Sequence, residues 1–179
     1  MPLFELIKKK EKKIVTVWVE RTLDSYISSD FFKQATNQFA NPVGANIRTG
    51  LTKIFQLMLS EAEAQDFVEP LDQVIRIRAV QEFTPAQAVA PFFELKWVVR
   101  QILSGDKQGR PLLSELAPFD REVDRVVLMA FDMYMRCRDR LHQARIRELK
   151  SGSYILTDSS CASAAIRENV QEIASLSGK

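Results

Sequence analysis

Residues 119–150 read FDREVDRVVLMAFDMYMRCRDRLHQARIRELK and contain neither glycine nor proline. Apolar side chains recur in this stretch every three or four positions, the spacing that places them on one face of an α-helix; they are Val123, Val126, Val127, Ala130, Tyr134, Cys137 and Leu141. The stretch therefore predicts one long helix, which at 1.5 Å per residue would span roughly 45 Å. A helix of that length exceeds the core of a small domain, so we expect its end to project outward or to pair with a second copy.

A second signal, a helix start, lies upstream at residues 84–87 (TPAQ). Thr84 can accept a hydrogen bond from the N–H of Gln87, and the Gln87 side chain can reach back to Thr84, which makes a capping box. The proline between them suits the first turn of a helix. We expect this helix to run to about Leu103. Pro91 lies inside it and cannot donate to the carbonyl of Gln87, so a kink is predicted there.

Three further helices are predicted from apolar spacing, over residues 3–27, 42–60 and 68–81. The pair Asn41-Pro42 has the pattern of an N-cap followed by the first helical residue. The β-branched run 14–19 also favours a strand, but the charged helix formers that flank it decide for a helix. The polar residues 104–111 (SGDKQGRP) predict a surface loop before the long helix.

The composition limits the fold class. The chain has 179 residues, of which 46% are hydrophobic, with only six glycines and seven prolines. That is enough apolar material for one core, and the scarcity of turn residues argues against a β-sandwich or barrel. We therefore expect an all-α fold, with a single helical domain of about five to six helices over residues 1–150. Residues 151–179 are expected to form a partly flexible tail with a short amphipathic helix (Ile166, Val170 and Ile173), which needs a partner surface because isolated short helices are marginal.

The net charge of +2 conceals two basic clusters. Residues 8–13 (KKKEKK) carry a net charge of +4, residues 136–150 also carry +4, and the remainder of the chain therefore carries −6. Clusters of this kind can bind nucleic acid or an anionic membrane surface. A solvated helix surface is the interpretation we favour, because no basic recognition motif with interleaved aromatic residues is present.

Little in the sequence suggests catalysis. One histidine and two cysteines exclude nearly every zinc site, which needs four suitable ligands or three and a water. No glycine-rich phosphate loop and no nucleophile elbow occur. His142 could act as a single haem ligand, but the arginines around it favour a surface position. Cys137 and Cys161 do not form a CxxC pair, so two free thiols are expected. We predict a protein that is not an enzyme and needs no cofactor.

No run approaches the ~20 apolar residues that cross a bilayer. The N-terminal lysines precede only the short apolar run 14–19, an order unlike that of a signal peptide. We therefore expect a cytoplasmic protein without a membrane span.

Asp132 interrupts an almost wholly apolar stretch, residues 128–135. A carboxylate in such a place must either face water or be paired. Arg136 is its local candidate partner, and Arg76 or Arg78 could reach it from the helix over 68–81. A structural ion pair is the interpretation we favour, and a role in a pocket or interface is the alternative. These four residues, Arg76, Arg78, Asp132 and Arg136, are the candidate site.

Three segments together resemble a known family. They are FANPVGANIRTGL (39–51), LDQVIRIRAVQEFTPAQAV (71–89) and LMAFDMYMRCRDRLHQARIREL (128–149). They resemble the RsbRD-type N-terminal sensor domain of the RsbT co-antagonist family of bacterial stress regulators, and the resemblance covers about residues 5–150. It rests on helix starts and helix faces, not on catalytic motifs.

The resemblance implies an all-helical input domain, globin-like without haem, which is usually attached to an output module such as a STAS domain or a histidine kinase. Only 29 residues follow Lys150, too few for either module. We therefore expect a stand-alone regulatory sensor or adaptor that acts on a protein partner, with homodimerisation through the long C-terminal helix as the simplest means of transmission. The rival interpretations are a nucleic-acid or anionic-membrane binder that uses the basic clusters, and a sensor that binds haem or another small ligand.

Overall fold

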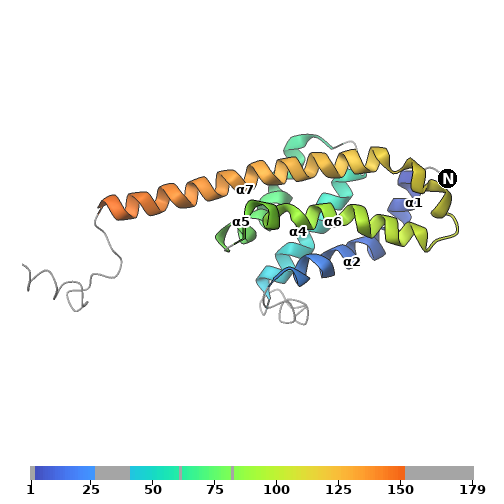
Figure 1. Cartoon of the computed structure of the whole chain (residues 1–179), viewed down its shortest axis with the longest axis horizontal. Helices are drawn as coiled ribbons and strands as arrows, with labels where there is room; N and C mark the ends of the chain where they lie inside the picture. Colours follow the sequence, from blue (N-terminus) through green and yellow to red (C-terminus); the bar gives the residue numbers. More distant parts are fainter. Residues whose placement is uncertain (1–2, 27–40, 61, 82, 152–179) are drawn as a thin grey trace, which may run out of the picture. The chain divides into compact units, whose positions relative to one another are not determined.

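The fold is all-helical over the residues that the structure, a computed structural model, describes: 3–26, 41–60, 62–81 and 83–151 (Figure 1). This range holds six α-helices, two 3-10 helices and no strand; the α-helices are α1 (Leu3–Lys9), α2 (Glu11–Asp24), α4 (Pro42–Met58), α5 (Val68–Val80), α6 (Pro85–Ser104) and α7 (Ala117–Ser151), and the 3-10 helices are η1 (Ala64–Phe67) and η2 (Arg110–Glu115). The predicted all-α class is confirmed. The chain divides into two compact units, residues 1–138 and 139–179, and the tail with its predicted short helix and Cys161 lies outside the described residues.

The predicted helix starts are both present. The Asn41 side chain accepts a hydrogen bond of 2.8 Å from the N–H of Gly44 at the start of α4. At the start of α6, Thr84 accepts from the N–H of Gln87 at 3.3 Å, and the Gln87 side chain accepts from the N–H of Thr84 at 2.9 Å. The capping box therefore satisfies two of the amide groups that a helix start leaves without partners.

The predicted helix over residues 3–27 is wrong in one respect, because it breaks at Lys10. The first helix, α1, ends at Lys9, and α2 begins at Glu11. The Lys10 ammonium donates a hydrogen bond to the carboxylate of Asp106 in the turn after α6. This bond holds the pKa of Asp106 below its usual value. The interruption lets α1 and α2 each direct an apolar face to the core, and the run 14–19 is helical.

The core of residues 1–138 is built around Trp18, which is fully buried. Its ring meets Phe92 edge to face at a centroid distance of 6.3 Å, and its indole N–H donates to the main-chain carbonyl of Pro91 at 2.7 Å. Helices α4 and α5 approach each other closely at Gly50. A Cβ on Gly50 would lie 2.7 Å from Cγ2 of Val74, so only glycine fits there without a shift.

The first part of α7 packs against α6, and its buried face is the one that the sequence predicts. The buried residues include Val123, Val126, Val127, Ala130 and Tyr134. Lys96 pairs with Asp124 at 2.7 Å, and Arg100 pairs with Asp120. Since the numbers rise along α6 as they fall along α7, the two helices are antiparallel (Figure 1). The predicted long C-terminal helix is confirmed.

The segment between α6 and α7 is a surface loop only in its first half. The Asp106 carboxylate accepts hydrogen bonds from the N–H groups of Gln108 (2.8 Å) and Gly109 (3.0 Å), which closes a turn. The chain then forms η2, where a loop was predicted to continue to residue 111. This local side-chain capping by an aspartate is typical of turns.

Candidate ligand pocket and interaction face

The buried face of α5 places a guanidinium in the protein interior. Leu71, Val74, Ile75 and Arg78 follow one another at helical spacing, and all four are buried, with Arg78 0% exposed. Burial of a charged side chain is costly unless the group is hydrogen-bonded or paired. The surroundings of Arg78 are therefore the first place to look for a function.

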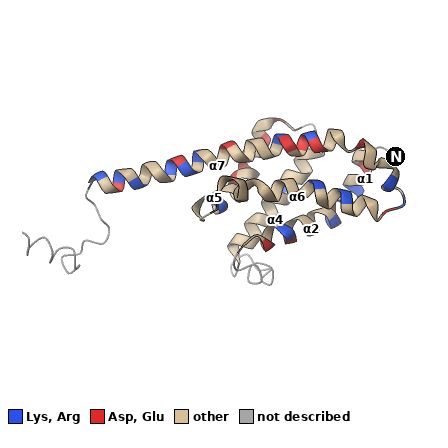
Figure 2. Cartoon of the chain, viewed as in Figure 1, with Lys and Arg blue, Asp and Glu red and all other residues tan. Residues whose placement is uncertain are grey.

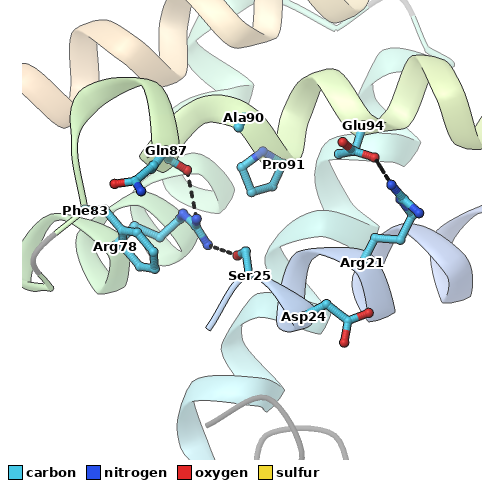
Figure 3. Close-up of a pocket in the computed structure, with 9 residues that line it drawn as sticks. All are labelled: Arg21, Asp24, Ser25, Arg78, Phe83, Gln87, Ala90, Pro91 and Glu94. Atoms are coloured by element: carbon cyan, nitrogen blue, oxygen red, sulfur yellow. Dashed lines mark hydrogen bonds and ion pairs between the residues drawn. The ribbon is translucent and has the colours of Figure 1, made fainter. Parts of the chain in front are cut away.

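Arg78 is held by neutral groups. Its Nη1 donates to Oγ of Ser25 at 3.0 Å, and its Nη2 donates to the main-chain carbonyl of Gln87 at 2.9 Å (Figure 3). The guanidinium carbon lies 4.9 Å from the ring centroid of Tyr26 and 4.3 Å from that of Phe83. These aromatic faces provide the cation–π contacts that a buried cation favours.

No carboxylate of the described residues forms an ion pair with Arg78. Its Nε is buried and has no hydrogen-bond partner in the same part of the chain. A guanidinium has five N–H donors, and two of them are used by Ser25 and Gln87. Burial raises the pKa of the nearby Tyr26 hydroxyl, and the positive charge of Arg78 opposes that rise. The core therefore keeps a positive charge and unused donors at this place.

A pocket of about 400 Å³ opens beside Arg78, between α2, the segment before α6, and α6 itself (Figure 3). It is lined by Arg21, Asp24, Ser25, Arg78, Phe83, Gln87, Ala90, Pro91 and Glu94. At its other end, Arg21 donates a hydrogen bond from Nε to Oε2 of Glu94 at 2.7 Å, and its Nη2 lies 2.6 Å from the same oxygen in an ion pair. Two cations and two carboxylates line the pocket, so the formal charge of its wall is zero.

A second hollow, of about 790 Å³, lies between α1, the end of α4 and the start of α7. Its charged lining residues, Glu122 and Arg125, pair with each other at 2.6 Å. The Arg125 guanidinium also lies 5.0 Å from the ring centroid of Phe67. Since these charges already satisfy one another, this hollow has less to offer a charged ligand than the pocket beside Arg78.

Large apolar side chains are exposed on both α6 and α7. The residues, which remain 38–67% exposed, are Phe93, Trp97, Leu128, Phe131 and Met135. The antiparallel pairing of the two helices brings Phe93 level with residues 127–128 of α7. We call this set of five residues the α6–α7 face. Large apolar side chains exposed on neighbouring helices are typical of interaction surfaces.

Residues 12–149 match the protein family described as the RsbT co-antagonist protein rsbRD N-terminal domain. The chain belongs to this family. The match covers most of the chain, including every helix of the pocket and both helices of the α6–α7 face. Membership indicates a regulatory role in stress-response signalling, exerted through a protein partner, and it confirms the resemblance read from the three sequence segments.

This RsbRD domain also has a relative in Archaeoglobus fulgidus. The two sequences are 26% identical over 140 residues, which covers 76% of this chain and 83% of the relative, a protein described as uncharacterized. No solved structure matches the chain. The globin-like arrangement implied by the resemblance therefore stays a prediction.

The structure places the four candidate site residues of this RsbRD domain in different environments. Arg78 lines the pocket, whereas Arg76 is exposed on α5 and pairs with Asp72 at 2.5 Å. Asp132 and Arg136 are both exposed on α7, so the carboxylate faces water. Neither of these two forms an ion pair with another residue of the described ranges.

Several pocket residues had no sequence signal of function. Ser25 and the main-chain carbonyl of Gln87 gain their role only because α2 and α6 both approach α5. Arg21 and Glu94 are 73 positions apart in the sequence, so no local pattern predicts that they pair. One signal did exist: Arg78 falls at the position where the apolar face of α5 continues, seven residues after Leu71.

The remaining charged and ligand candidates of the RsbRD domain are exposed. His142 is exposed on α7. In the first basic cluster, Lys10 forms an ion pair with Asp106, whereas the remaining lysines of residues 8–13 are exposed. Figure 2 shows basic residues predominating along the last part of α7, the second cluster. The described residues include no group of three or more potential metal ligands.

None of the helices in the described part of the chain combines the length and the apolar character needed to span a bilayer. The expected cytoplasmic location stays a prediction.

Proposed function

We propose that residues 1–150 form a non-catalytic regulatory domain, a sensor or adaptor that acts through protein–protein contact. Membership of the RsbRD family supports the regulatory role. The observation that carries the contact is the α6–α7 face, where Phe93 and Trp97 of one helix and Leu128 of the next leave apolar surface in water. Burying that surface in a complex would be favourable by the same effect that builds the core.

The partner we propose for this face is a second copy of the chain. Leu128, Phe131 and Met135 form one stripe along α7, at a spacing of three and four residues. Asp132 and Arg136 are one turn apart beside this stripe and carry exposed charges that no described residue neutralises. A two-fold axis brings a surface against itself, so in an antiparallel pair of α7 helices each Asp132 would lie level with Arg136 of the other copy. The stripe would be buried and two ion pairs would close beside it.

Sedimentation velocity over a range of protein concentrations tests this proposal. We expect the full chain to be a dimer, and we expect Phe131→Ser to raise the dimer dissociation constant by at least about fivefold, because truncating a buried aromatic anchor costs more than about 1 kcal/mol. Val80→Ser is the matched control, since Val80 is 64% exposed on α5, outside the α6–α7 face, and its replacement should leave the association unchanged. A chain that stays monomeric at every concentration would refute the proposal.

Charge reversal tests the antiparallel arrangement. Asp132→Arg alone and Arg136→Asp alone each place like charges opposite one another, so each should weaken the dimer. The double variant restores opposite charges and should recover most of the loss. If the double variant is as weak as the two single variants combined, α7 does not pair antiparallel through these residues.

A rival function uses the two basic clusters, residues 8–13 with their exposed lysines and residues 136–150, to bind nucleic acid or an anionic membrane. Such binding would weaken steeply between about 50 and 200 mM salt. Fluorescence anisotropy with a labelled DNA duplex, and flotation with vesicles that contain anionic lipid, would each detect it. Binding that Lys12→Glu abolishes would favour this rival. A visible absorption spectrum of the pure protein tests the haem alternative.

A further inference from the structure

The pocket beside Arg78 presents a positive charge at one end. The guanidinium of Arg78 lies in the wall of the pocket. No carboxylate of the described residues forms an ion pair with it, and its Nε has no hydrogen-bond partner among them. A guanidinium binds a carboxylate through two parallel N–H···O bonds, of which Nε and one Nη commonly supply the donors. This end of the pocket therefore suits a carboxylate group.

The other end of the pocket presents an acceptor. Glu94 accepts the hydrogen bond from Nε of Arg21 on Oε2, and Nη2 of Arg21 pairs with that same oxygen. The second carboxylate oxygen, Oε1, accepts no hydrogen bond from the described residues. An ammonium group has three donors and pairs readily with such an oxygen. A second anionic group would instead be repelled by Glu94, so a polyanion such as phosphate is disfavoured.

The two ends are separated by an apolar wall. Gln87, whose carbonyl binds Arg78, and Glu94 are seven residues apart on α6, which corresponds to about 10 Å along the helix axis. Ala90 and Pro91 lie between them on the pocket side of the helix (Figure 3). A ligand that reaches both ends must therefore carry its two charges several bonds apart, with an apolar chain between them.

We infer that the pocket binds a small zwitterion, a molecule with a carboxylate at one end, an ammonium group at the other, and a short apolar chain that lies along Ala90 and Pro91. The carboxylate pairs with Arg78 and the ammonium with Glu94. The Arg78 side chain is 0% exposed, so the half-buried ring of Phe83 that covers it at 4.3 Å turns aside when the carboxylate enters. The pocket volume of about 400 Å³ accommodates a molecule of this size.

In the proposed sensor role, this zwitterion is the signal that the domain detects. That role rests on the proposed function, whereas the binding itself does not. Binding is measured on the full chain alone by isothermal titration calorimetry, with 6-aminohexanoate as the probe. Hexanoate lacks the ammonium, hexylamine lacks the carboxylate, and glycine carries both charges too close together. We expect 6-aminohexanoate to bind at least about tenfold more tightly than each of the three, because a hydrogen bond between charged groups is lost in every comparison.

Two variants assign the ends of the ligand. Glu94→Gln should reduce the affinity for 6-aminohexanoate by about tenfold and leave hexanoate unaffected. Arg78→Met should abolish binding of both, and Arg76→Met, an exposed position on the same helix, should abolish neither. Circular dichroism shows whether the Arg78 variant folds. If that variant is unfolded, Glu94→Gln still tests the inference, because it changes a half-exposed side chain.

Absence of 6-aminohexanoate binding to the folded wild-type chain would overturn the inference, as would equal affinity for hexylamine. Either result leaves the sedimentation measurement untouched, so a failure of this ligand class and a failure of the proposed dimer are told apart.

Discussion

Nη2 of Arg78 donates a hydrogen bond of 2.9 Å to the main-chain carbonyl of Gln87, the carbonyl that Pro91 leaves without a helical donor. In an α-helix this carbonyl would accept from the N–H four residues later, and proline has none. A side chain of α5 thus completes the hydrogen bonding of α6. The carbonyl of Pro91 itself accepts from the indole of Trp18 on α2 at 2.7 Å. Hydrogen bonds from two neighbouring helices, α5 and α2, therefore meet α6 at Gln87 and Pro91.

Replacement of Arg78 tests this relationship. Arg78→Met should lower the free energy of unfolding by about 1–3 kcal/mol, because it leaves the Gln87 carbonyl without its donor in a partly buried place and removes the bond to Ser25. In a Pro91→Ala background, the new alanine N–H supplies the missing donor, so the same change should cost about 1–2 kcal/mol less. Urea unfolding followed by circular dichroism measures all four corners of this cycle.

The control for that cycle is Arg76→Met, two residues earlier on the same helix. Arg76 is exposed, and its pair with Asp72 is a surface ion pair, so the free energy of unfolding should change by no more than about 0.5 kcal/mol. Equal costs of Arg78→Met with and without Pro91 would show that the guanidinium does not stand in for the proline's absent donor.

Trp18 provides the second prediction. Trp18→Phe keeps an aromatic ring against Phe92 but removes the donor to the Pro91 carbonyl, so we expect a loss of about 1–3 kcal/mol in the free energy of unfolding. Trp97→Phe is the matched control. Trp97 is 46% exposed and loses only part of its contact with the Arg21 guanidinium, which should cost less than about 1 kcal/mol. The chain has two tryptophans, so in each variant the fluorescence of the other reports unfolding.

The helix starts could be predicted because their signals are local. The groups that cap α4 at Asn41 and α6 at Thr84 lie three residues apart in the sequence. The long helix α7 could be predicted from the regular return of apolar residues from Val123 to Tyr134. The break at Lys10 could not, because the partner of its ammonium, Asp106, is 96 residues away.

The candidate site shows the same limit more sharply. The sequence indicates that Arg78 occupies the apolar face of α5, and it indicates that Pro91 leaves the Gln87 carbonyl without a donor. Arg78 donates to that carbonyl only because α5 packs against α6, and the spacing of residues in the sequence does not predict this packing. Asp132 shows the limit from the other side. Its apolar neighbours in sequence indicate that it either faces water or is paired, and the helix turns the carboxylate to water beside the exposed stripe of α7.

The turn after α6 yields a prediction with two glycines. A Cβ on Gly109 would lie 2.6 Å from the main-chain oxygen of Leu103 and 2.8 Å from its Cα, and backbone atoms cannot easily give way. Gly109→Ala should therefore destabilise the fold by about 1–3 kcal/mol.

A Cβ on Gly105 would lie 3.7 Å from its nearest neighbours, and the backbone there is in the right-handed helical region. Gly105→Ala should be neutral or stabilising by up to about 1 kcal/mol. Thermal unfolding of the two variants, compared with the wild type, measures the contrast. Equal melting temperatures for both would refute the crowding at Gly109.

Tyr26 makes the last prediction, which concerns alkaline pH. Burial raises the pKa of its hydroxyl above the usual value of 10.0, while the positive charge of Arg78 opposes the rise. The unfolded chain therefore releases this proton at a lower pH than the folded chain does. The stability that the neutral hydroxyl contributes is fully present below about pH 10, the unfolded pKa, and declines as the pH rises through the folded pKa.

Lysines and the other tyrosines also titrate in this range, but they do so equally in a Tyr26→Phe variant. The difference in the free energy of unfolding between wild type and Tyr26→Phe should be constant from pH 7 to about pH 9 and should move in favour of the variant above about pH 10. Curves that stay parallel across that whole interval would show that Tyr26 titrates alike in both states.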